Sequence, residues 1–77
     1  MSIRVRYFAS LRERVGRGED EIEAEGVATV ADVWARLNHD LRLPENVLFA
    51  VNMDYAEAGA PVRDGDEVAF FPPVTGG

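Results

Sequence analysis

The chain has 77 residues, enough for one hydrophobic core. A domain of this size buries only about 60% of the surface that its unfolded chain exposes, so a deep enclosed catalytic pocket is not expected. Fourteen acidic residues against eight arginines give a formal net charge of −6, the wrong sign for binding a phosphate backbone, so no nucleic-acid partner is predicted. Because the sequence has no cysteine, no bilayer-spanning apolar run and no signal-peptide pattern, we predict a cytoplasmic protein without disulfides or a membrane partner.

Two strands are predicted at the start of the chain. Residues 2–8 alternate between two faces, which carry Ile3, Val5 and Tyr7 on one side and Arg4, Arg6 and Phe8 on the other. Residues 9–15 indicate a turn or a short helix, broken by Gly16 and Gly18. Residues 20–25 alternate again, with three glutamates on one face, which is typical of an edge strand that avoids pairing with other chains. Together the two strands predict a hairpin.

The clearest helix follows these strands. Thr29 can cap its N-terminus, with Asp32 three residues later in a capping-box arrangement. Apolar residues then recur at helical spacing and predict one stripe that packs on a sheet, formed by Val30, Val33, Trp34, Leu37 and Leu41. We therefore expect Trp34 in the core and the helix to end before Pro44.

The second half of the chain predicts two clear strands and a weakly patterned stretch. Residues 47–52 form an apolar run of strand length, and residues 53–62 suit one short strand and turns. Asp64-Gly65 is a strong turn signal, and residues 67–71 predict a last strand that Pro72 ends. This order favours an α+β roll, with one main helix packed across a mixed sheet of four to five strands in a single domain, residues 1–77.

Residues 72–77 are predicted to form an extended, flexible C-terminal tail. Pro72 and Pro73 favour an extended exit from the last strand, and Gly76 and Gly77 carry no side chain that could clash in a narrow channel. Six extended residues reach about 20 Å, enough to place a carboxylate in another protein's active site. A merely frayed terminus is the alternative.

Three blocks of the sequence resemble the small subunits of molybdopterin synthase, a ubiquitin-like sulfur-carrier family. They are residues 5–13, residues 50–52 and, most specifically, residues 64–77, which end in Phe-Phe-Pro-Pro-Val-Thr-Gly-Gly. The resemblance covers essentially the whole chain and implies the β-grasp fold of ubiquitin.

The resemblance also implies a chemical role for the chain end. A partner ATP-dependent enzyme of the ubiquitin-activating type would adenylate the carboxylate of Gly77 at the end of the Gly76-Gly77 pair. A sulfur source would then displace AMP and leave a thiocarboxylate. Inside the large synthase subunit, this group would donate sulfur to the cyclic pyranopterin monophosphate precursor and form the molybdopterin dithiolene. The chain would not be catalytic alone, would hold no stable cofactor, and would act in a heterotetramer with the large subunit.

Strand parity predicts a docking surface at the root of the tail. Charged residues mark the outward face of the first and last strands, and the same parity places Phe8 and Phe71 outside. In the fold that the resemblance implies, these strands are parallel neighbours, so the two rings are expected to form one apolar patch, which a partner would cover. The resemblance points to Phe8, Arg12 and Phe71 as contacts, and the predicted partner-binding set is completed by Pro72, Pro73, Val74 and Thr75. The alternative is that Phe71 folds onto Pro73 or a loop.

Other sites have too few suitable residues. His39 is the only histidine, so a His/Cys metal site lacks ligands, and neither Ser2 nor Ser10 stands in a nucleophile-elbow context. Two further functions stay open at this point: a sulfur carrier for thiamine synthesis or tRNA thiolation, and a ubiquitin-like protein modifier.

Overall fold

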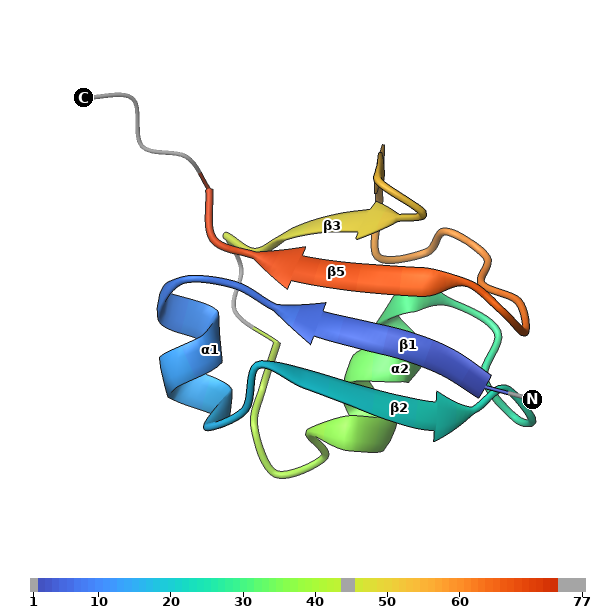
Figure 1. Ribbon diagram of the computed structural model, residues 1–77, viewed down its shortest axis with the longest axis horizontal. Helices are drawn as coiled ribbons and strands as arrows, with labels where there is room; N and C mark the ends of the chain where they lie inside the picture. Colours follow the sequence, from blue (N-terminus) through green and yellow to red (C-terminus); the bar gives the residue numbers. More distant parts are fainter. Residues whose placement is uncertain (1, 44–45, 74–77) are drawn as a thin grey trace.

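The computed structural model describes residues 2–43 and 46–73, which form one mixed five-stranded sheet and two helices (Figure 1). The elements in chain order are β1 (Ser2–Tyr7), α1 (Ser10–Val15), β2 (Glu19–Glu23), α2 (Val30–Leu37), β3 (Leu48–Val51), β4 (Asp54–Ala56) and β5 (Glu67–Phe71). The predicted α+β architecture is confirmed, because this order and the helix across the sheet are those of a β-grasp fold.

The strands lie in the order β2-β1-β5-β3-β4, so β2 and β4 are the edges. β1 and β2 form the predicted antiparallel hairpin, while β1 and β5, the first and last strands, pair in parallel. β3 pairs antiparallel with both β5 and β4. Because β5 runs parallel to β1, it ends at the same end of the sheet as the short helix α1 (Figure 1).

The core lies between the sheet and α2, which crosses one face of it (Figure 1). The indole of Trp34 on α2 meets the rings of Tyr7 and Phe70 edge-on, with centroids 6.1 and 5.2 Å apart. The helix begins with the predicted capping box, in which the Thr29 hydroxyl accepts from the Asp32 N–H and the Asp32 carboxylate accepts from the Thr29 N–H. The hydrogen bonds that the Asp32 carboxylate accepts from the Ala28 and Thr29 N–H groups lower the pKa of Asp32.

The prediction that the helix includes Leu41 is wrong. α2 ends at Leu37, and Asn38 leaves the helical conformation with φ −130° and ψ 51°. Leu41 still packs against the core from the turn that follows, where its carbonyl accepts a 2.8 Å hydrogen bond from the Trp34 indole. Pro44, expected just past the helix end, lies outside the described residues.

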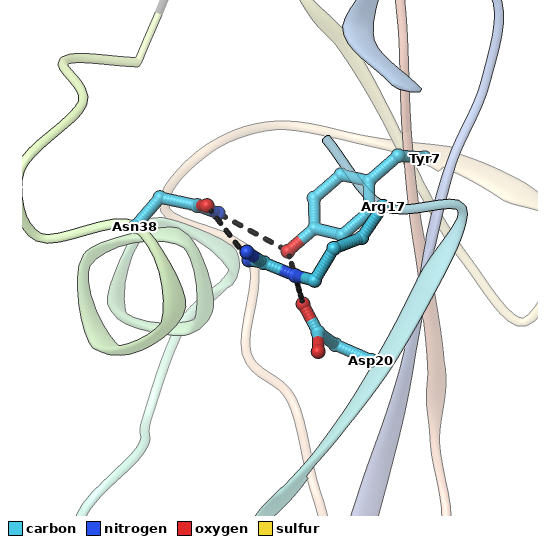
Figure 2. Close-up of polar contacts among 4 residues, drawn as sticks. All are labelled: Tyr7, Arg17, Asp20 and Asn38. Carbon is cyan, nitrogen blue, oxygen red and sulfur yellow. Dashed lines mark hydrogen bonds and ion pairs between the residues drawn. The ribbon is translucent and has the colours of Figure 1, made fainter. Parts of the chain in front are cut away.

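A polar cluster of Tyr7, Arg17, Asp20 and Asn38 explains why the helix stops there (Figure 2). The buried amide of Asn38 donates to the Tyr7 hydroxyl at 3.1 Å and accepts from the Arg17 guanidinium at 3.0 Å. Tyr7 and Arg17 both donate to the carboxylate of Asp20. The cluster thus ties the end of α2 to the β1–β2 hairpin, and burial raises the pKa of the Tyr7 phenol.

Within residues 2–43 and 46–73, the helices are too short to cross a membrane.

Candidate functional site

The face of the sheet opposite α2 has two halves of different character. Arg4 and Arg6 of β1 point outward. They lie opposite Glu21 and Glu19, respectively, of the neighbouring edge strand β2. On the other side of β1, Arg4 pairs with Glu67 of β5. This half is an alternation of opposite charges, which neutralises itself and leaves little driving force for a partner to cover it.

The other half of this face is apolar. The register places Phe71 beside Leu48 of β3, and Ala69 beside Ala50, which is in turn paired with Tyr55 of β4. With Phe8, which follows β1, these side chains make up the outer apolar patch: Phe8, Leu48, Ala50, Tyr55, Ala69 and Phe71. An apolar area on the open face of a sheet is the kind of surface that a protein partner covers.

Phe8 and Phe71 both lie on the outer face, as strand parity predicts. Phe8 is 41% exposed, and the Arg6 guanidinium lies 5.4 Å from its ring centroid. Phe71 is half-buried, and the ring beside it is that of Tyr55, with centroids 5.9 Å apart. The patch is therefore wider than the expected pair of rings and extends across three strands towards the β4 edge.

Tyr55 is the aromatic member of the patch that the sequence did not indicate; Leu48 and Ala50 of β3 were not indicated as members either. Tyr55 is 79% exposed on the three-residue strand β4, which is too short to show a clear alternation. In the sequence, Tyr55 is a lone aromatic residue between two stretches rich in turn-forming residues. The strand pairing with Ala50 is what brings it beside Phe71.

Arg12 lies on α1, at the end of the sheet where β5 finishes (Figure 1). The helix is six residues long and ends at Gly16, whose φ of 86° is in the left-handed region that glycine tolerates best. The Arg12 guanidinium packs over the backbone of Gly18, where an added Cβ would come within 3.1 Å of its Nε atom. Gly18 therefore gives this arginine room to lie beside Arg6 and Glu19 in a shallow hollow.

The described part of the predicted tail consists of Pro72, which is half-buried, and Pro73, which is exposed. They follow β5 directly, so the tail leaves the sheet at the strand that carries Phe71. Val74, Thr75, Gly76 and Gly77 lie outside the described residues. The structure thus brings Phe8, Phe71 and the tail root to one end of the sheet, with Arg12 on the adjoining helix.

Asn52 and Asp66 brace the opposite end of the patch. The Asn52 amide donates to the Asp66 carboxylate at 2.9 Å and its oxygen accepts from the Glu67 N–H at 3.0 Å, which fixes the β3–β4 turn to the start of β5. The hydrogen bond from Asn52 lowers the pKa of Asp66. Asn52 and Met53 both have positive φ, 52° and 71°, and Met53 is 90% exposed.

Comparison with known proteins gives consistent results along the whole chain. The model of the ThiS family matches residues 5–77. The molybdopterin synthase sulfur carrier subunit of Escherichia coli K12 is 42% identical over an alignment of 84 positions, covering 97% of this chain and 99% of the relative. Small archaeal modifier protein 1 of Haloferax volcanii is 31% identical, covering 94% and 97%. A crystal structure of that modifier superposes with a TM-score of 0.77 at 29% identity and covers both chains completely.

Proposed function

This chain belongs to the ThiS family, and from that premise we propose that it is the sulfur carrier subunit of a molybdopterin synthase. The observation that carries the proposal is its 42% identity, over nearly the full length of both chains, to a relative that bears this name. The Phe-Phe-Pro-Pro-Val-Thr-Gly-Gly ending and the outer apolar patch at its root supply the parts that a carrier needs: a reactive end and a surface by which a partner holds the body.

The chemistry would take place at the carboxylate of Gly77, which Gly76 precedes. A carboxylate is a poor electrophile at neutral pH, because its α-carboxyl pKa of about 3.5 keeps it ionised, so it must first be activated. In an adenylating partner, a Gly77 oxygen attacks the α-phosphorus of ATP and releases pyrophosphate. A hydrosulfide-equivalent donor then attacks the acyl carbon, AMP leaves, and Gly77 ends as a thiocarboxylate.

In the second half of the cycle the thiocarboxylate would donate its sulfur within the large synthase subunit. The acceptor is the cyclic pyranopterin monophosphate precursor, and hydrolysis of the acyl link returns Gly77 to a carboxylate. The dithiolene product contains two sulfurs, so two deliveries are required for each product. ATP is consumed by the activating partner, so we propose no cofactor bound to this chain. We place the cycle in the cytoplasm.

The body would hold the partner while the tail reaches the reaction centre. We propose Phe8, Arg12 and Phe71 as contacts, together with Tyr55, whose ring lies beside that of Phe71. Residues 72–77 would form the arm, with Pro72 and Pro73 stiffening its root and Val74 and Thr75 contacting the channel that leads to the active site. In this arrangement the chain supplies position and the activated acyl group, and the large subunit supplies catalysis.

A protein modifier is the second candidate, favoured by the likeness to small archaeal modifier protein 1 in both sequence and structure. A modifier would use the same activated Gly77, but an amine of a target protein would capture the acyl carbon in place of sulfur. The two functions therefore share the first step and differ in the acceptor.

The test follows the mass of the chain and the fate of its terminus. After incubation with the adenylating enzyme, ATP and a sulfide donor, intact-mass spectrometry is expected to show one oxygen replaced by sulfur at Gly77. Adding purified large subunit and precursor is then expected to yield molybdopterin. A thiocarboxylate that yields no molybdopterin would exclude the synthase role, and lysine-linked conjugates with other proteins would favour the modifier.

A further inference from the structure

A groove beside the tail root is separate from the outer apolar patch. It has a volume of about 530 Å³ and lies between α1, the segment before β3 and the residues that follow β5. Leu11 and Val47, both buried members of the core, form an apolar floor, and Pro72 and Pro73 form the wall from which the tail departs. None of the residues of the outer apolar patch lines this groove.

The charged residues that line the described part of the groove have one sign. Arg14 on α1 and Arg42 in the segment before β3 are both exposed, and among the described residues no carboxylate lines the groove with them. This local positive charge stands out because the whole chain has a formal net charge of −6. Net charge alone would suggest a basic partner, whereas the charge next to the tail root suggests an acidic one.

The combination of two guanidinium groups with an apolar floor selects the kind of ligand. A guanidinium binds a carboxylate through two parallel N–H···O bonds, and the floor accepts an apolar side chain. In the proposed extended tail, the reacting carboxylate of Gly77 would stand about 13 Å beyond Pro73, so the phosphates of ATP or of the precursor would meet the chain away from this groove. Its ligand is therefore expected to be the protein surface that surrounds the tail.

We propose that the groove beside the tail root binds a carboxylate-bearing, partly apolar segment of the large synthase subunit, through Arg14 and Arg42. The inference rests on the proposed function and adds a second contact area, so that the partner grips the body on both sides of the departing tail. Since both arginines are exposed, their main effect is on the rate of association and on its salt dependence.

The test compares charge reversal in the groove with charge reversal elsewhere. The double variant Arg14→Glu/Arg42→Glu is expected to associate with purified large subunit at least about tenfold more slowly at low salt, with a weaker dependence on salt. The matched control Arg36→Glu/Arg63→Glu changes the net charge by the same amount on α2 and beside the far turn. It is expected to associate within about twofold of the wild-type rate.

Two further variants keep the result interpretable. Arg14→Lys/Arg42→Lys retains the charge but not the two parallel N–H···O bonds, so it is expected to associate as fast as the wild type and to dissociate faster. Thermal denaturation of the reversed variant checks that it is folded. If the reversed variant associates as fast as the control, or if its defect appears only as a raised KM for ATP in the adenylation step, the proposal is overturned. A wild-type chain that fails to bind the large subunit at all would overturn the proposed function instead.

Discussion

The two faces of the sheet are built from the same strands but have different tasks. On the inner face, Tyr7, Trp34 and Phe70 form a cluster of aromatic rings that are 3% exposed or less. On the outer face, the neighbouring residues Phe8 and Phe71 remain exposed or half-buried, with no helix over them among the described residues. The adjacent residues Phe70 and Phe71 of β5 therefore have different roles. Phe70 stabilises the core, and Phe71 is available to a partner.

The largest effect on stability is expected from the inner face. Phe70→Ala removes a ring that is fully buried and in contact with Tyr7, Trp34 and Phe49, so it should lower the free energy of unfolding by about 3–5 kcal/mol. Urea denaturation followed by Trp34 fluorescence measures this loss. A loss below about 1 kcal/mol would mean that the ring is not a core element.

The neighbouring residue should show the opposite behaviour. Phe71→Arg is expected to change the free energy of unfolding by about 1 kcal/mol or less, yet to weaken binding to the large subunit by about 2 kcal/mol or more, because an aromatic anchor is lost and a charge must be buried. Calorimetric titration measures the binding. Ala35→Arg, which adds the same charge on the exposed side of α2, is the control and should bind normally. If Phe71→Arg unfolds the protein, the outer ring belongs to the core and the contrast between the faces fails.

A smaller loss of stability is expected at the polar cluster that ends α2. Asn38→Ala leaves the buried Tyr7 hydroxyl without its donor and removes one of the two acceptors of Arg17, which should lower the free energy of unfolding by about 1–3 kcal/mol. In a Tyr7→Phe background the same substitution should cost less, since one of the two bonds is already gone. Equal costs in both backgrounds would show that Asn38 does not act through Tyr7.

These features differ in how far the sequence could predict them. Alternation in β1 and β5 and the capping box at Thr29 are local patterns, and each was predicted with nearly correct bounds. Three of the four hydrogen bonds of the polar cluster join residues 13 to 31 positions apart, so no local pattern reveals it, and the end of α2 at Asn38 was missed for that reason. Tyr55 was missed likewise, because only the pairing of β3 with β4 brings it beside Phe71.

The smallest effect concerns the turn at the far end of the outer face. Met53 has a φ of 71°, which is strained for a residue with a side chain, and it is 90% exposed. Met53→Gly relieves this strain and should therefore raise the free energy of unfolding by up to about 1 kcal/mol. The gain is reduced by the greater conformational entropy that glycine gives the unfolded chain. Thermal denaturation is the measurement, with Asp54→Gly, at the exposed start of β4, as the control that should lose stability.

The central claim is that the end of the tail is the reactive group, and synthesis of molybdopterin by variants of the terminus tests it most directly. A chain without Gly77, and a chain extended by one alanine after it, should fold and bind the large subunit like the wild type through the outer apolar patch. Both should yield no molybdopterin from precursor, ATP and sulfide donor in the reconstituted system. Normal product formation by either variant would contradict the account.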